Sequence, residues 1–189
     1  DMQVGQFVHL KVPDPSKLLR RPISISEIDY DKKEATIVYR VEREGTAILS
    51  KMVAGLTIDT MGPQGNGFDI SVIEAGQKAL LVGGGIGVPP MVQLGKTLKA
   101  NGCTQVQTIA GYRDELFLTE ELGASGAFYV ATEDGSAGTK GNVLDAVREQ
   151  GIEADVIYAC GPKPIFVPSK PMQRKRESSA IFPWKSVWP

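Results

Sequence analysis

The sequence predicts a β domain followed by an α/β domain, namely an incomplete antiparallel barrel and then a doubly wound parallel sheet. Residues 1–75 contain short runs of alternating polarity separated by turn residues, without the pattern of a long helix. Residues 76–165 alternate continuous apolar runs with helical patterns, as expected of parallel strands that are covered on both faces. Residues 166–189 differ in composition from both regions and form an atypical basic tail.

In the first region, strands are predicted over residues 6–12, 21–28 and 34–41. Residues 45–50 and 62–68 are predicted to form turns, because Gly, Pro, Asn and hydroxyl side chains favour them. In the second region, strands are predicted over residues 79–82, 104–110, 127–131 and 155–159. The predicted helices cover residues 89–99, 115–122 and 142–150, and the first begins at a pair of prolines.

The composition is that of an ordinary soluble globular protein, with 189 residues of which 42% are hydrophobic and 23% charged. The formal net charge of -1 favours neither nucleic acid nor a membrane surface as a partner. The apolar stretch over residues 79–94 is interrupted by Gly and Pro, so it is not expected to span a bilayer. Two cysteines and one histidine provide neither a disulfide framework nor a local metal cluster. We expect a cytoplasmic protein without a signal peptide.

The first functional motif is a Gly-Gly-Gly-Ile-Gly loop between an apolar strand and a helix. Gly83, Gly84, Gly85 and Gly87 would let the backbone approach a pyrophosphate, whose charge is stabilised at a helix N-terminus. A simple tight turn is the rival interpretation, because Val88 stands where the usual dinucleotide motif has its last Gly. The position after the first parallel strand favours nucleotide binding.

Two further motifs are weaker in isolation. Cys160 and Gly161 end the last apolar strand, where open sheets collect ligands, although a buried structural cysteine is the alternative. Arg21 offers a planar donor fork suited to a phosphate, and Ser24 offers a hydroxyl for a ring nitrogen or carbonyl. The adjacent Arg20 and Arg21 are also typical of a solvated surface.

Together these motifs resemble the electron-transfer subunits of class 1B dihydroorotate dehydrogenases, within the ferredoxin-reductase superfamily. The resemblance covers about residues 3–165 and is carried, in order, by R-P-I-S, V-Y-R, G-T with L-S, G-P-Q-G-N-G-F, L-V-G-G-G-I-G-V-P-P, T-E-D-G-S-A-G-T-K-G and C-G-P-K-P. It implies FAD on the barrel, residues 1–75, and NAD on the nucleotide-binding α/β domain, residues 76–165. In the family, a [2Fe-2S] cluster then passes electrons to a dihydroorotate dehydrogenase catalytic subunit, in a heterotetramer that serves pyrimidine biosynthesis.

The resemblance also implies a role for each matching position. The flavin and its diphosphate would be held by Arg21, Pro22, Ile23 and Ser24, lined on the other side by Val38, Tyr39 and Arg40, with phosphate contacts from Gly45 and Thr46. The nicotinamide nucleotide would be held by Gly83, Gly84, Gly85 and Gly87, with Cys160 and Gly161 beside the nicotinamide. No general acid or base is required, because hydride transfer to a flavin depends on alignment and on the flavin's potential.

The chain departs from the family at both ends. The family has further barrel strands before the stretch that matches residues 4–7, so the chain is expected to begin inside its first domain. No cysteine follows Cys160, so the family's cluster ligands are absent and no iron is expected in this chain. We interpret the tail as a frameshift product, because residues 181–189 admit a coding sequence that reads Y-L-S-L-E-E-R-M-A one base earlier, a family segment. A natural Pro-rich basic tail is the alternative.

Two other functions stay open from the sequence. The chain could serve as the flavin reductase subunit of another ferredoxin-NADP reductase-like complex, or it could be an inactive remnant. For the leading interpretation, NADH is expected over NADPH because Asp114 and Glu115 follow the second parallel strand and would repel a 2′-phosphate. Arg113 in the same loop opposes this expectation.

Overall fold

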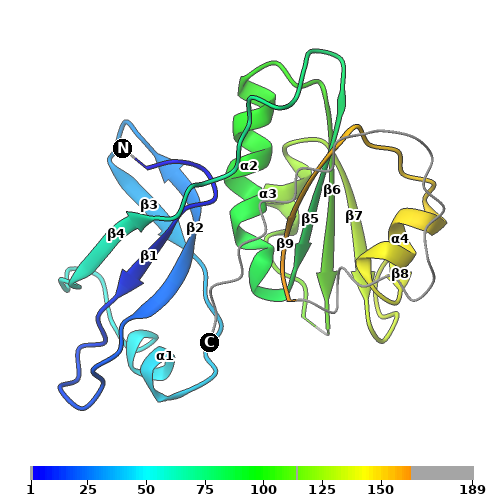
Figure 1. Cartoon of the computed structure of the whole chain (residues 1–189). Helices are drawn as coiled ribbons and strands as arrows, with labels where there is room; N and C mark the ends of the chain where they lie inside the picture. The colour runs from blue at the N-terminus through cyan, green and yellow to red at the C-terminus, as the bar shows by residue number, and fades with distance from the viewer. Residues whose placement is uncertain (1, 114, 163–189) are drawn as a thin grey trace.

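The computed structural model describes residues 2–113 and 115–162, which form two sheets side by side (Figure 1). The first sheet is antiparallel, has four strands in the order β3-β2-β1-β4, and contains β1 (Phe7–Leu10), β2 (Arg21–Asp29), β3 (Glu34–Ile37) and β4 (Thr60–Gln64). Its core gathers alternate residues of β1 and β2, with Val8, Leu10 and Ile25 packed against Leu49 of helix α1 (Glu44–Leu49).

Two short elements correct the predictions for the first region. The segment 45–50 is mostly helical rather than a turn, because its Leu49 is buried in the core and the Thr46 hydroxyl accepts the Glu42 and Arg43 backbone N–H groups where the helix begins. The predicted turn over 62–68 is partly the strand β4, which tolerates Pro63 because it lies at the sheet edge. The third strand also ends at Ile37, before the predicted limit of residue 41.

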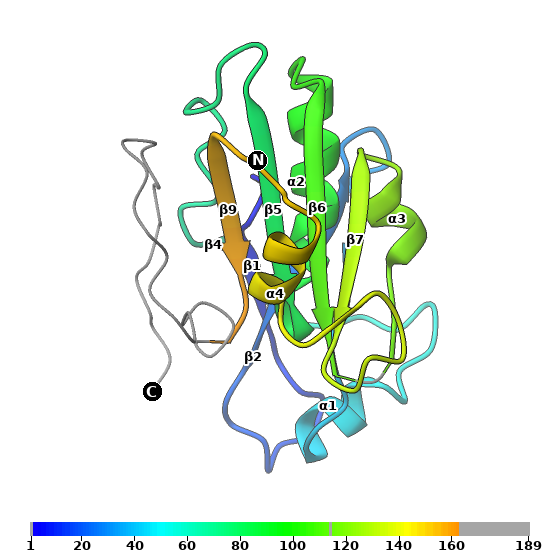
Figure 2. The ribbon, with the colours of Figure 1, turned by 90° about the vertical axis from the view of Figure 1, so that its right-hand side faces the viewer.

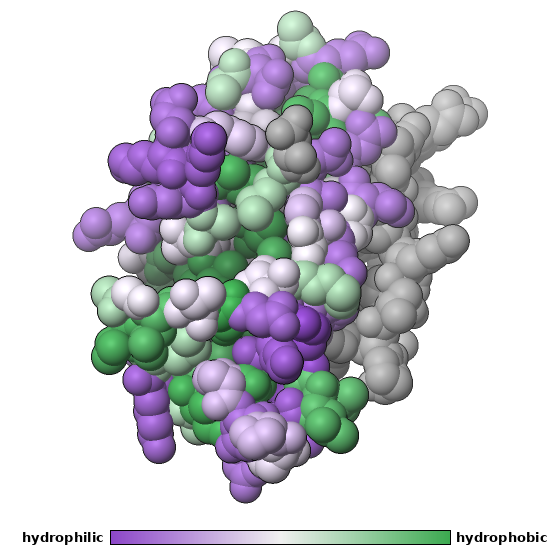
Figure 3. Space-filling model, turned by 90° about the vertical axis from the view of Figure 1, so that its left-hand side faces the viewer, coloured by the Kyte–Doolittle hydropathy of each residue, from purple (hydrophilic) through white to green (hydrophobic). Residues whose placement is uncertain are grey.

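The antiparallel sheet stays open among the described residues. Its strand order is linear, so β3 and β4 are its edges and no barrel closes within the described ranges. Figure 3 shows apolar side chains gathered in a hollow on this side of the molecule, with polar side chains around it. The large apolar residues that stay exposed in this half are Leu18, Leu19, Tyr30, Val41, Val53, Leu56 and Met61. The described residues therefore form an open antiparallel sheet beside an α/β domain, which agrees with the incomplete barrel predicted from the sequence.

The second sheet is parallel and has five strands in the order β8-β7-β6-β5-β9. The strands are β5 (Lys78–Gly84), β6 (Gln105–Tyr112), β7 (Ala127–Thr132), β8 (Thr139–Lys140) and β9 (Val156–Cys160). Helices α2 (Pro89–Ala100) and α3 (Thr119–Gly123) cover one face, and α4 (Val143–Glu149) covers the other (Figure 2). Helices on both faces confirm the doubly wound prediction.

Most elements of the second region lie within two residues of their predicted limits. The strand β8 was not predicted, because two residues carry too little pattern. The helix α3 begins at Thr119 rather than at residue 115, so that limit was wrong. The segment before this helix is a non-helical connection. It is anchored by the Tyr112 hydroxyl, which donates a hydrogen bond to the Phe117 carbonyl at 2.7 Å. No helix in the described ranges is long and apolar enough to cross a membrane.

Candidate functional site

The glycine loop lies between β5 and α2 and includes a single turn of 3-10 helix, Gly85–Gly87. Gly83 cannot carry a side chain without a shift, because a Cβ there would lie 2.9 Å from the Val88 Cα. Gly85 has φ +51 and is exposed, so the loop uses the left-handed conformation that favours glycine. Gly84 is buried and extended. The predicted strand-glycine-helix arrangement is confirmed.

The loop meets the second motif at the point where the strand order reverses. Strand β5 pairs with β6 on one side and with β9 on the other, so the carboxyl ends of β5 and β9 flank a topological switch point. A Cβ on Gly87 would lie 2.2 Å from the Cys160 carbonyl oxygen, which leaves room only for glycine. The two motifs are distant in sequence, and the structure brings them into direct contact.

The donors that this edge offers to an anion are mainly loop amides. Pro89 and Pro90 occupy the first two positions of α2 and carry no N–H group. The N–H groups of Val88 and Met91 are already bonded, to Gly85 O at 3.1 Å and to Val88 O at 3.0 Å. The first turn of the helix therefore offers an anion fewer donors than the loop backbone does.

Cys160 places a neutral thiol, rather than a reactive thiolate, at this end of the sheet. Its side chain packs against the core of the parallel sheet, and this burial raises the pKa of the Cys160 thiol. Because only the thiolate is a strong nucleophile, the thiol at the strand end is expected to be unreactive at neutral pH. Gly161 follows with φ +156 and turns the chain away from the strand.

The antiparallel sheet carries the second cluster of predicted residues. A groove of about 620 Å³ lies beside the start of α1 and is lined by Lys17, Arg21, Val41, Glu42, Arg43, Glu44, Gly45 and Ala47. Its cations include Lys17 and Arg43, which the sequence motifs did not identify. The available signal was that a basic residue shortly precedes each motif, Lys17 before Arg21 and Arg43 before Gly45. Lys17 also pairs with Glu44. Arg21 and Gly45, predicted separately, meet in this groove.

The remaining predicted residues of this sheet lie on two faces. Arg21 and Ile23 share the face of the core, whereas Pro22 and Ser24 share the opposite face, since strand residues alternate. Ser24 lies opposite Phe7 of β1 in the register. The Thr46 hydroxyl donates to the Arg43 carbonyl at 2.9 Å and stabilises the turn that presents Gly45.

The three residues after β3 are less closely placed. Tyr39 packs against the core of the antiparallel sheet, Val38 is half-buried and Arg40 is exposed. The structure thus joins Arg21 to Gly45, and the glycine loop to Cys160, but it records no contact that ties residues 38–40 to either pair.

The loop predicted to choose between nucleotides follows β6 at the same sheet edge. The Arg113 Nε atom lies 4.0 Å from the Glu133 carboxylate, and both side chains are largely exposed. Glu115 is exposed as well, and Asp114 lies outside the described residues. Because β5 and β6 are neighbouring parallel strands, this loop and the glycine loop lie at the same carboxyl end of the sheet.

The two clusters belong to one packed body. Ser26 of β2 is buried and its hydroxyl donates to the Pro89 carbonyl at 3.1 Å. On another side, Phe68 packs edge-on against Tyr158 of β9, whose hydroxyl donates to the Asp69 carbonyl at 3.1 Å. The first contact joins β2, which carries Arg21, to the helix that follows the glycine loop, and the second joins the segment after β4 to the strand that ends at Cys160.

Comparison with known proteins identifies the relatives of this chain. No family model matches it. It is 69% identical over 163 residues to the dihydroorotate dehydrogenase B (NAD(+)) electron transfer subunit of Streptococcus thermophilus (strain ATCC BAA-491 / LMD-9), covering 85% of this chain and 63% of that protein. It is 46% identical over 187 residues to the same subunit of Geobacillus sp. (strain WCH70), covering 97% of this chain and 69% of that protein.

A solved structure of an NADH-dependent reduced ferredoxin-NADP oxidoreductase superposes with a TM-score of 0.76 at 31% identity, covering 87% of this chain and 59% of that one. The chain thus spans less than two thirds of the Streptococcus relative and slightly more than two thirds of the Geobacillus one. The sequence identity and the fold agree with the resemblance carried by the motifs. The chain belongs to the family of dihydroorotate dehydrogenase B (NAD(+)) electron transfer subunits.

Proposed function

We propose that this chain is part of an electron-transfer flavoprotein subunit that passes electrons from NADH through FAD to a dihydroorotate dehydrogenase catalytic subunit in pyrimidine biosynthesis. The observation that carries the proposal is the direct packing of Ser26 on Pro89, which joins the strand of Arg21 to the helix of the glycine loop. A protein that transfers a hydride between two bound cofactors needs both sites on one rigid body.

The groove beside α1 fits the diphosphate of FAD. Arg21, Lys17 and Arg43 bring three positive charges to a groove that two carboxylates, Glu42 and Glu44, also line. The absence of a side chain at Gly45 makes room for the Arg21 guanidinium. Within residues 1–75, Pro22, Ile23 and Ser24 would hold the flavin ring, Val38, Tyr39 and Arg40 would line its other side, and Gly45 and Thr46 would meet phosphate. The residues that line the groove fit the diphosphate part of FAD.

The glycine loop fits the nicotinamide nucleotide. Within residues 76–165, Gly83, Gly84, Gly85 and Gly87 would allow the close approach of a pyrophosphate, with its charge met by loop N–H groups. Cys160 and Gly161 would lie beside the nicotinamide. The thiol of Cys160 is neutral and partly buried, so it would place no charge next to the ring. The switch point between β5 and β9 is where doubly wound sheets bind such ligands.

The chemistry requires alignment rather than acid-base catalysis. Bound FAD would supply the acceptor for a hydride from the reduced nicotinamide. The residues of this chain would hold the two rings at transfer distance, bind both diphosphates and exclude water from the crevice.

The [2Fe-2S] cluster of the family does not fit the cysteines of this chain. Only Cys103 and Cys160 are present, whereas such a cluster needs four thiolates. Cys103 contacts the Gln77 carbonyl before β5 begins, and Cys160 pairs in register with Gly83 near its end, so the two lie at opposite edges of the sheet. We therefore propose no electron step through a cluster here. The tail, residues 166–189, lies outside the described residues. We further propose that the protein forms a heterotetramer with the catalytic subunit. We also propose a cytoplasmic location, where free cysteines stay reduced.

The test is a titration of the purified full chain with FAD, followed by anaerobic addition of NADH. We expect quenching of FAD fluorescence at stoichiometric protein, and bleaching of the flavin absorbance by NADH. A chain that binds no FAD would leave the remnant interpretation. Bleaching without electron delivery to an added dihydroorotate dehydrogenase catalytic subunit is the expected result for this chain, and metal analysis with stoichiometric iron would contradict it.

A further inference from the structure

The strand β2 is irregular at the place where helix α2 crosses it. Its pairing with β3 shifts by one residue between Ile25 and Glu27, which marks a β-bulge. Ile25 and Ser26 are both buried, at 1% and 2% exposure, although they are consecutive. Ile25 packs in the core with Leu49, while the Ser26 hydroxyl reaches the Pro89 carbonyl. Bulges often re-aim side chains next to functional sites, and this one lets β2 contact two layers at once.

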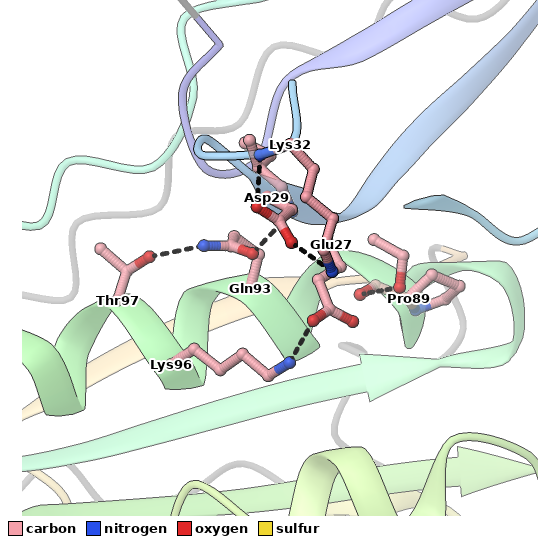
Figure 4. A network of polar contacts seen from close by, with 9 residues as sticks. Glu27, Asp29, Lys32, Pro89, Gln93, Lys96 and Thr97 are labelled. Carbon is pink, nitrogen blue, oxygen red and sulfur yellow. Dashed lines mark hydrogen bonds and ion pairs between the residues drawn. The ribbon is translucent and has the colours of Figure 1, made fainter. Parts of the chain in front are cut away.

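Gln93 of α2 completes the link between the strand and the helix (Figure 4). Its Oε1 atom accepts the backbone N–H of Ile28 at 2.8 Å, and its Nε2 atom donates to the Thr97 hydroxyl at 3.4 Å. Gln93 is 9% exposed, so water has little access to replace these partners. One helical turn further, Lys96 forms an ion pair with Glu27, which is more exposed and therefore weaker.

Each end of this link leads to one of the two proposed sites. Gln93 lies one turn after Pro89, and only Val88 separates Pro89 from the glycine loop. Ile28 lies on the same strand as Arg21 and Ser24. Because a helix and a strand are stiff over such short distances, any sliding of α2 along β2 would change the separation of the two sites by a similar amount.

We propose that Gln93 is a positioning residue for hydride transfer: its hydrogen bond to Ile28 N–H sets the distance between the nicotinamide held by the glycine loop and the flavin held by β2. The inference rests on the proposed function. Gln93 need not touch either cofactor. It acts through the backbone of β2 and through the start of α2.

The experiment compares variants of the full chain in anaerobic stopped-flow mixing with NADH. Gln93→Met keeps the length of the side chain but removes the acceptor, whereas Gln93→Glu keeps an acceptor oxygen for Ile28 N–H. Thr97→Val removes the other hydrogen bond of Gln93, which lies within the helix, and is the matched control. Ser26→Ala removes another polar contact between β2 and α2, and this variant serves if Gln93→Met fails to fold.

We expect Gln93→Met to slow the limiting rate of flavin reduction by about tenfold to a hundredfold, since a misplacement of about 1 Å can cost on the order of a hundredfold. The long-wavelength charge-transfer absorbance of the nicotinamide-flavin complex should fall in parallel, while the dissociation constants of FAD and NADH change less than about threefold. Gln93→Glu should restore most of both signals, and Thr97→Val should match the wild type. Ser26→Ala should shift both signals in the direction of Gln93→Met.

The outcomes separate this role from the proposed function. If the wild-type chain binds FAD and is reduced by NADH, but folded Gln93→Met is reduced at the same rate with the same charge-transfer absorbance, the positioning role is wrong and the proposed function stands. Equal losses in Gln93→Met and Thr97→Val would show a general loosening of the helix and would also overturn it. If Gln93→Met does not fold, a Ser26→Ala rate equal to that of the wild type overturns the role. A wild-type chain that binds no FAD would overturn both.

Discussion

The Arg21 guanidinium occupies the space that a side chain at position 45 would fill. A Cβ built on Gly45 would lie 2.7 Å from both Nε and Nη2 of Arg21. Arg21 Nη1 also donates to the Leu19 carbonyl at 2.7 Å, so the side chain is held against the helix start. Arg21 and Gly45 therefore depend on each other, one as donor and the other as the space that admits it.

The first prediction follows from this contact. Gly45→Ala should displace the Arg21 guanidinium and weaken FAD binding by about tenfold, since a hydrogen bond to a charged group contributes about 1.5–3 kcal/mol. Gly123→Ala is the control, because nothing lies within 4 Å of a Cβ there. Fluorescence titration with FAD measures both. An unchanged affinity in Gly45→Ala would remove this groove from the flavin site.

The second prediction concerns the charge of Arg21 itself. Arg21→Ala should raise the dissociation constant of FAD by roughly tenfold to a hundredfold, because a hydrogen bond to a charged group contributes about 1.5–3 kcal/mol. Arg20→Ala is the matched control: its guanidinium pairs with Asp59 at 2.7 Å instead of lining the groove. Equal flavin retention in Arg21→Ala and the wild type would contradict the assignment.

The same contact shows what a local pattern can and cannot predict. Spaced apolar residues predicted β2, a continuous apolar run predicted β5, and a run of glycines predicted the loop before α2, because each of these signals lies within a few residues. The helix α1 was predicted to be a turn, since what stabilises it is the burial of Leu49 under a sheet built from distant strands. Lys17 and Arg43 were missed for the same reason: only the folded chain brings them beside Arg21.

Gln93 illustrates the limit more sharply. In the sequence it is one polar residue on a helix, at a position that nothing distinguishes from a solvated one. Its partner, Ile28 N–H, is separated from it by 65 residues and faces it next to a bulge that no local pattern announced. The individual elements were thus predictable, whereas the contact that joins the two proposed sites was not.

The third prediction concerns nucleotide choice. NADH should reduce the flavin faster than NADPH, because Glu115 lies in the loop after β6 and Arg113 lies toward Glu133 rather than being fully available to a 2′-phosphate. Glu133→Gln should weaken the preference by removing the carboxylate partner of Arg113. Reduction kinetics with both nucleotides test this, and faster reduction by NADPH in the wild type would reverse the assignment.

The fourth prediction uses the pKa of Cys160. Burial raises the pKa of this thiol, so the neutral form dominates at neutral pH and the thiolate fraction grows only as the pH rises toward that raised pKa. Alkylation of Cys160 by iodoacetamide should therefore be slow at pH 7 and faster at pH 9. Saturating NAD+ should slow it further, since Cys160 adjoins the glycine loop. Peptide mass spectrometry measures the extent of modification. Rapid labelling at pH 7 would contradict the conclusion that the Cys160 thiol is neutral at that pH.

The last prediction concerns a substitution that adds one methyl group and should affect the nucleotide site but not the flavin site. Gly87→Ala places a Cβ 2.2 Å from the Cys160 carbonyl oxygen, and the three nearest atoms all belong to the Cys160–Gly161 peptide, which is backbone and has little room to yield. The loop must then move away from β9, and the nucleotide edge should open. We expect the dissociation constant for NAD+ to rise by at least about tenfold, because a displaced loop loses backbone hydrogen bonds to the charged pyrophosphate, which contribute about 1.5–3 kcal/mol each. FAD affinity should stay within about twofold of the wild type, because the basic groove is lined by residues 17–47 and not by this loop. Isothermal titration with NAD+ and fluorescence titration with FAD measure the two affinities on one sample. Loss of both together would mean that the glycine loop supports the fold as a whole rather than a nucleotide site.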